Sequence, residues 1–225
     1  MDRRDFVIST FACFAGLATA SRTVSGQKKA IEPDLASLVE GKGLKVFNRS
    51  LSSLNDGAKK CVRMSESEGD GQAYLQGVEF ANGTIELEIK GKDVLQQSFV
   101  GLAFHGMDDK TYDAIYFRPF NFKNEDAARR LRAVQYISHP TYTWQKLRTE
   151  HPGKYEKPVN PVPDPNEWFH ARIVVASPKV SVFVNDAKEP CLVVEQLSDR
   201  KKGLVGLWVG NTSGGDFANL KIIPA

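Results

Sequence analysis

A series of short segments in which hydrophobic and polar residues alternate constrains the fold of this chain more than any other feature. In the clearest segment, Thr84–Lys90, the hydrophobic residues Ile85, Leu87 and Ile89 alternate with polar ones. A period of two is typical of a β-strand with one buried face. Similar segments follow at residues 100–105, 113–120, 132–137, 169–176, 180–185, 191–194, 204–209 and 217–223. About ten short strands with almost no helical periodicity predict an all-β sandwich.

One long segment, residues 121–166, interrupts this pattern. Its proline-rich part, 158–165, is excluded from helices and central strands because proline lacks an amide hydrogen. Long loops in compact domains are usually functional or disordered. This one carries Tyr142, Trp144 and Tyr155, so we expect an ordered flap packed by aromatic side chains; its charged residues leave disorder as the alternative. An extended chain would point Tyr142 and Trp144 the same way, toward one end of a cleft.

The composition excludes several classes of protein. A chain of 225 residues is long enough for one large β domain with a sizeable core. Lysine and arginine total 30 and aspartate and glutamate 27, so the net charge is only +3. A nucleic-acid partner would require a concentrated basic face, and we expect no such partner. The sequence also contains no glycine-rich phosphate loop and no serine nucleophile elbow.

The N-terminal residues have the pattern of an export signal. Arg3 and Arg4 precede an apolar run, 6–20, that is too short to span a bilayer. The run ends in the small-x-small sequence Ala-Thr-Ala, a suitable cleavage site. The Arg-Arg-x-Phe pattern resembles a bacterial twin-arginine export signal.

We therefore expect a signal peptide at residues 1–26, a lead-in with one short helical turn at 27–43, and the sandwich domain at 44–225. Export predicts a periplasmic or secreted protein. No later apolar stretch is long enough to cross a membrane, so we expect no membrane partner after the signal is cleaved. An oxidising compartment permits a disulfide between Cys61 and Cys191; two separate buried thiols are the alternative.

The strand at 204–209 separates two kinds of side chain. Val205, Leu207 and Val209 share the core side, which leaves Trp208 on the other side between two glycines. A large aromatic between glycines forms a flat platform of the kind on which sugars stack their C–H faces. Trp208 is therefore a candidate sugar-binding residue; a core tryptophan under the flap is the alternative.

Neighbouring strands carry further polar candidates. Strict alternation places four polar side chains opposite the core residues of their strands, on one concave sheet: His105, Tyr116, Arg118 and Gln135. Donors for hydroxyl groups, one base and one aromatic floor suit a carbohydrate. A structural role is the alternative for His105, and anchoring of the flap through a carboxylate is the alternative for Arg118.

The sequence also contains five segments that occur together in one known family: Phe99–Gly106, Tyr112-Asp113, Asn166–Ile173, Gly203–Gly210 and Asp216–Ile222. Over residues 44–224 the chain resembles the 3-keto-disaccharide hydrolase-like family. The resemblance implies a concanavalin A-like jelly roll, here with a long flap insertion. It also implies an exported bacterial protein linked to carbohydrate processing, with a carbohydrate or glycoside as its partner.

Two hypotheses about function follow. The first is a hydrolase or lyase of a modified glycoside, in particular a 3-keto sugar. Hydrolysis of a glycosidic bond usually needs two carboxyl groups at a defined separation. Elimination needs only one base, and often a metal Lewis acid, because the ketone acidifies the neighbouring C–H. The second hypothesis is a non-catalytic carbohydrate-binding module or scaffold, which the missing carboxylate pair favours, so whether the chain is an enzyme stays open.

The residues expected to take part fall into two groups. The catalytic group is His105, Asp113 and Arg118. The substrate-binding group is Tyr116, Gln135, Trp144 and Trp208. Cofactors stay unknown; a divalent metal is one option, with His105 and Asp113 as the best-placed pair of ligands. Strict alternation puts Asp113 on the core side of its strand, so it reaches the cleft only if the strand begins after it.

Overall fold

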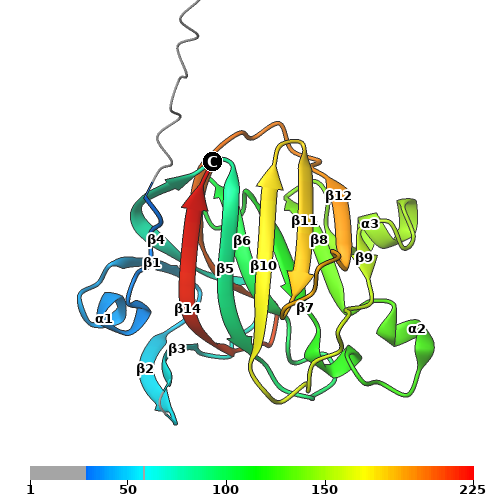
Figure 1. Ribbon diagram of the computed structural model, residues 1–225, viewed down its shortest axis with the longest axis horizontal. Coiled ribbons are helices and arrows are strands. Elements are labelled where there is room, and N and C mark those ends of the chain that lie inside the picture. Colours follow the sequence, from blue (N-terminus) through cyan, green and yellow to red (C-terminus); the bar gives the residue numbers. More distant parts are fainter. Residues whose placement is uncertain (1–28, 58) are drawn as a thin grey trace, which may run out of the picture.

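The computed structural model describes residues 29–57 and 59–225 (Figure 1). The predicted signal peptide at residues 1–26 lies outside this part of the chain. The remainder of the predicted lead-in contains α1 (Leu35–Glu40), whose N-cap Asp34 accepts a hydrogen bond from the Ser37 amide at 3.2 Å. No helix of the described residues is both long and apolar enough to cross a membrane.

Two seven-stranded antiparallel sheets form a β-sandwich, as the alternation predicts. Sheet I contains, in spatial order, β1 (Leu44–Phe47), β4 (Gly71–Phe80), β13 (Gly203–Val209), β6 (Val100–Gly106), β7 (Tyr112–Phe117), β8 (Val134–His139) and β9 (Glu156–Lys157). Sheet II contains β12 (Leu192–Glu195), β11 (Lys179–Val184), β10 (Phe169–Ala176), β5 (Gly83–Lys90), β14 (Gly215–Pro224), β3 (Lys59–Met64) and β2 (Leu51–Asp56). Figure 1 shows sheet II in front of sheet I. The fold is a jelly-roll β-sandwich.

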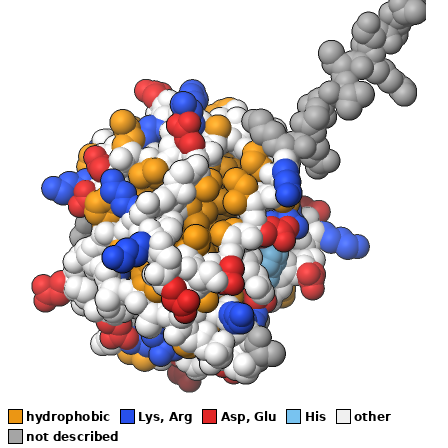
Figure 2. Space-filling view, turned by 90° about the vertical axis from the view of Figure 1, so that its left-hand side faces the viewer, with side chains coloured by type: hydrophobic (Ala, Val, Ile, Leu, Met, Phe, Trp, Pro, Cys, Tyr) orange, Lys and Arg blue, Asp and Glu red, His pale blue; other side chains and the backbone are white. Residues whose placement is uncertain are grey.

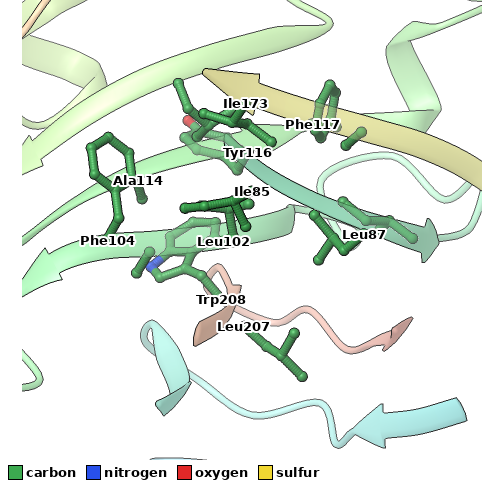
Figure 3. Packing of buried hydrophobic residues seen from close by; sticks show 14 of the residues in the cluster. Ile85, Leu87, Leu102, Phe104, Ala114, Tyr116, Phe117, Ile173, Leu207 and Trp208 are labelled. Atoms are coloured by element: carbon green, nitrogen blue, oxygen red, sulfur yellow. The ribbon is translucent and has the colours of Figure 1, made fainter. Parts of the chain in front are cut away.

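The core lies between the two sheets. On β5, Ile85, Leu87 and Ile89 are all fully buried, which confirms the prediction for this strand. Leu102 and Leu207 meet them from sheet I, and Figure 3 shows several of these side chains packed together. Because both sheets contribute one apolar face, burial of these faces is the main stabilising contribution.

Four strands before Gly83 are not individually predicted by the sequence. Of these, β2 lies at the edge of sheet II and carries Ser52 and Ser53 exposed to solvent, so it lacks a hydrophobic alternation. Figure 2 shows the side of the molecule on which α1 and β1 lie; hydrophobic side chains gather near its middle and charged ones surround them.

The flap is ordered, as its aromatic residues predict. It contains α2 (Ala127–Arg130) and α3 (Trp144–Glu150), and it supplies β8 and β9 to sheet I. The side chain of Thr143 caps α3 by accepting a hydrogen bond from the Lys146 amide at 3.3 Å. Leu147 and Tyr155 are buried and attach the flap to the core cluster.

The two cysteines of the described residues are both free thiols, so the predicted alternative of two separate thiols is the one observed. The Cys61 thiol lies 3.5 Å from the Leu54 carbonyl oxygen, and the Cys191 thiol lies 3.4 Å from the Val182 carbonyl oxygen. Each thiol thus lies near a carbonyl oxygen of a neighbouring strand, and burial raises the pKa of both thiols.

Candidate functional site

A cavity of about 610 Å³ lies on the outer face of sheet I, the face turned away from sheet II. Alternation on β7 places Tyr116 on this face and Ile115 in the core, as predicted. Side chains of β7, β8 and β13 form the floor of the cavity. Its walls come from the flap and from the loops that carry Asp70, Gln96 and Asn211.

Aromatic rings form the floor. Trp208 and Tyr116 lie on either side of Gly101 in the strand register, and their ring centroids are 4.9 Å apart. Because glycine places no side chain between them, the two rings touch. Phe99 meets the Tyr116 ring edge-to-face at 6.0 Å, and Phe120 meets Phe99 in the same way at 5.4 Å. Trp208 is only 3% exposed, so it offers the cavity a small part of its surface.

A hydrogen-bonded network joins three of the predicted site residues. Nη2 of Arg118 donates to the Tyr116 hydroxyl at 2.6 Å and to Oε1 of Gln135. The Tyr116 hydroxyl donates to the same Gln135 oxygen at 2.9 Å, and burial raises its pKa to about 12. Gln135 is fully buried and does not line the cavity, so its role is to orient Tyr116 and Arg118.

Trp144 stands at the rim of the cavity, at the start of α3. Its side chain is 41% exposed, and the guanidinium of Arg148 lies over its ring, 4.9 Å from the centroid. Tyr142 does not join it: it lines a separate hollow beside Leu197 and Asp199. The chain turns into a helix after Thr143, so the extended geometry assumed for Tyr142 and Trp144 is wrong.

His105 does not share the face of Tyr116 and Trp208, so its predicted placement in the cleft is wrong. Its φ of 49° accompanies a shift in the pairing of β6 with β13, and this irregularity breaks the alternation. The ring is fully buried between Phe80 and Phe104. Its Nε2 lies 2.6 Å from the Ala81 carbonyl oxygen.

Asp113 faces the core beside His105, with 3.7 Å between the carboxylate and Nδ1. Its oxygens accept hydrogen bonds from Tyr136 at 2.8 Å and Ser198 at 2.6 Å, and Arg200 approaches to 3.1 Å. Burial acts to raise its pKa, but the nearby His105 ring, the hydrogen bond from Ser198 and the charge of Arg200 hold the pKa below its ordinary value.

The pair of His105 and Asp113 therefore does not fit a metal site, because the carboxylate already neutralises an arginine. Within the described part of the chain, no group of three or more His, Cys, Asp or Glu side chains gathers as a metal-binding set.

The structure adds three residues that the sequence interpretation did not select. The Tyr112 hydroxyl donates to Oδ2 of Asp70 at 2.8 Å and lies 3.5 Å from Nδ1 of His139. The rings of Tyr112 and His139 stack with centroids 5.0 Å apart. Asp70 and His139 line the cavity. The sequence feature that could have identified His139 is its spacing: it lies four residues beyond Gln135, on the same face of one strand.

Burial favours the neutral form of His139. It lowers the pKa of the imidazole, and the charge of Arg200 acts in the same direction, against the opposing effect of Asp70. The ring is therefore neutral at neutral pH and has a lone pair for a proton. A neutral imidazole at the wall of a cavity is able to act as a general base.

The model of the family described as "3-keto-alpha-glucoside-1,2-lyase-like domain" matches residues 34–223 of the chain. A comparison with curated proteins gives no match.

Solved structures share the fold at low sequence identity. The carbohydrate-binding module CBM66 from Bacillus subtilis is 17% identical, with a TM-score of 0.54 over 80% of this chain and 95% of that one. A protein of unknown function with a galectin-like fold from Bacillus subtilis is 11% identical, with a TM-score of 0.56 over 88% and 96%. The exoplasmic/lumenal domain of VIP36 in its Ca²⁺/Man2-bound form is 10% identical, with a TM-score of 0.52 over 81% of each chain. These identities show a common fold and nothing about activity.

Proposed function

The chain belongs to the 3-keto-alpha-glucoside-1,2-lyase-like domain family, and from this premise we propose that it binds a saccharide in the sheet I cavity and cleaves it by elimination next to a 3-keto group. The observation that carries the proposal is a neutral histidine, His139, in the wall of an aromatic-floored cavity. Elimination needs one base, and His139 supplies it.

The binding half of the proposal rests on the shape and chemistry of the cavity. A volume of about 610 Å³ is in the range of small-molecule sites. Phe99 and a small part of Trp208 present apolar surface from the floor and Trp144 presents it from the rim, which suits the C–H faces of pyranose rings. The similar fold of a carbohydrate-binding module supports a sugar as the ligand.

The chemical half follows from the acidity of a keto sugar. A ketone at C3 acidifies the C2–H, and the leaving oxygen is on C1, one bond further. His139 takes the C2 proton, the C–H electron pair forms the C1=C2 double bond, and the C1–O bond breaks. The protonated imidazole then returns a proton to the departing oxygen, which restores the base and balances the step.

Tyr112 and Asp70 orient the base. Burial raises the pKa of Tyr112, and the negative charge of Asp70 acts in the same direction, so the phenol stays protonated and keeps donating to the carboxylate. The stacked Tyr112 ring fixes the plane of the His139 imidazole. These two residues are positioning residues, because the proton transfer occurs at His139.

Elimination fits the cavity better than hydrolysis does. Among the described residues, the two carboxylates that line the cavity are Asp70 and Asp126. Asp70 accepts the Tyr112 hydrogen bond, and Asp126 caps α2 at 2.8 Å and pairs with Arg129 at 3.7 Å. Each already has a structural partner, whereas glycoside hydrolysis usually needs one carboxyl group as acid and a second as base or nucleophile.

The test is a turnover assay on the full chain with maltose and with 3-keto-maltose, the products read by mass spectrometry. We expect cleavage of the keto compound alone, and loss of at least a hundredfold in rate for His139→Gln. His151→Gln is the matched control, because His151 is exposed at the end of α3 and does not line the cavity. Unchanged turnover in His139→Gln would overturn the assignment of the base.

Binding without chemistry is the second candidate function. It is favoured by the network of Tyr116, Arg118 and Gln135, in which three hydrogen bonds hold the polar groups in place. Saccharide binding in calorimetry with no product from either disaccharide would establish it. Export through a twin-arginine signal also stays a prediction, and sequencing the N-terminus of the protein recovered from a bacterial periplasm would test it.

A further inference from the structure

One side of the cavity carries an excess of positive charge. Arg118, Arg132 and Arg148 approach the same carboxylate, Glu156, which is 5% exposed. Nε and Nη2 of Arg148 donate to its two oxygens at 2.9 and 2.6 Å. Arg118 and Arg132 each stop at 3.7 Å from it. Among the salt bridges of the described residues, these three arginines share this single carboxylate, so two positive charges stay uncompensated.

The buried arginine, Arg118, shows that the excess of positive charge is unfavourable. Burial lowers the pKa of Arg118, and the charges of Arg148 and Arg132 act in the same direction. Its own donors are occupied by Tyr116, Gln135 and the Arg132 carbonyl oxygen, the last at 2.9 Å. An anion bound beside Arg118, Arg132 and Arg148, here called the basic cluster, would relieve the repulsion between these arginines.

The two outer arginines are the ones that a ligand can reach. The side chain of Arg132 is 43% exposed and that of Arg148 is 27% exposed, and both line the cavity. The guanidinium of Arg132 presents a planar fork of N–H groups that matches the two oxygens of a carboxylate or a sulfate. Arg148 uses Nε and Nη2 for Glu156, which leaves its Nη1 for a ligand. Trp144 lies under Arg148, so an apolar surface for a sugar ring adjoins the basic cluster.

The basic cluster and the base are separated along the strands. Tyr116 pairs with Gln135 at one end of β7 and β8, and Tyr112 pairs with His139 four residues away. Four residues of a strand span about 13 Å. A ligand that reaches both His139 and the outer arginines is therefore longer than a single pyranose ring.

We propose that the natural saccharide is acidic: it carries an anionic group, a carboxylate or a sulfate ester, that binds Arg132 and Arg148 while a neighbouring sugar unit lies at His139. The proposal rests on the proposed function, since it names the substrate class of the same cavity. A carboxylate and a sulfate ester are both oxyanions with at least two acceptor oxygens. Separate probes, one for each group, distinguish them.

The test is isothermal titration calorimetry of the full chain with three probes: maltose, the disaccharide in which glucuronic acid replaces its non-reducing glucose, and maltose 6′-sulfate. We expect at least one acidic probe to bind ten or more times tighter than maltose at low salt, with the gap shrinking as salt is added. The probe that binds tighter identifies the carboxylate or the sulfate as the preferred anion.

Arg132→Gln tests the assigned residue, because Arg132 makes only the longer contact with Glu156 and its loss leaves the Arg148 pair intact. The variant should lose most of the preference for the acidic probe, measured as the ratio of its affinity to that for maltose. Lys202→Gln is the control for net charge, since Lys202 lies on the surface and pairs with Glu79 at 2.9 Å.

Three outcomes separate the inferences. Equal binding of neutral and acidic probes overturns the acidic substrate and leaves saccharide binding standing. A preference that survives Arg132→Gln overturns the assignment to this cluster. If none of the three probes binds, the acidic substrate is overturned, and cleavage of 3-keto-maltose in the turnover assay decides the proposed function separately.

Discussion

Replacing Glu156 by glutamine removes the carboxylate with which Arg118, Arg132 and Arg148 all pair in the described part of the chain, and keeps the shape of the side chain. At 3.7 Å and an effective dielectric constant of about 20, each longer contact contributes about 4 kcal/mol of attraction before desolvation is counted. Measured losses on removing one partner of a buried pair are about 3–5 kcal/mol. Water reaches Arg132 and Arg148, so we expect the lower value, about 3 kcal/mol.

The assay is thermal and urea unfolding followed by circular dichroism. For a domain of this size, about 3 kcal/mol corresponds to a fall of about 6–12 °C in Tm. Asp126→Asn is the control, because Asp126 is exposed and its salt bridge with Arg129 is long, so it should cost under about 1 kcal/mol. A loss for Glu156→Gln no larger than that of the control would refute the description of Glu156 as the counter-charge of the cluster.

Three further predictions follow from the exposure and the contacts of single side chains. Trp144→Ala should weaken saccharide binding at least tenfold in calorimetry while Tm changes little, because the ring is 41% exposed; unchanged affinity would contradict its place at the rim. His105→Ala should lower the free energy of unfolding by about 2–4 kcal/mol, because it leaves buried hydrogen-bond partners unmatched. Saccharide binding should be retained. Lost binding in a variant as stable as the parent would show that His105 belongs to the site. Asp113 has a lowered pKa in the folded state, so the stabilisation that its carboxylate contributes is present above about pH 4 and is lost as the pH falls below that value. In urea unfolding between about pH 2 and 6, the free energy of unfolding should therefore fall less steeply with falling pH in Asp113→Asn than in the parent. Parallel curves would contradict this prediction.

The sequence predicts most of the strands of the sandwich because burial of one face imposes a period of two. The same rule places Tyr116 and Trp208 correctly on the outer face of sheet I. It fails at His105, where a positive φ and a register shift turn the side chain into the core. Such an irregularity depends on pairing with β13, about a hundred residues away in sequence, and leaves no periodic signal.

Two features of the site depend on contacts that no local pattern contains. Asp70 precedes β4 and reaches Tyr112 through the fold, 42 residues apart in sequence. Glu156 belongs to a strand of two residues, too short to show alternation. The basic cluster around Glu156 exists only once β9 pairs with β8 and α3 packs beside them. Sequence patterns identify the faces of long strands, whereas charge clusters between short elements require the tertiary structure.

The most direct measurement for the central claim is a crystal structure of the His139→Gln variant soaked with 3-keto-maltose, because the inactive variant should retain its substrate. We expect the disaccharide in the sheet I cavity, with one ring against Trp144 or Phe99 and the C2 atom of the keto sugar facing residue 139. A disaccharide bound elsewhere, such as on the outer face of sheet II, would contradict the account.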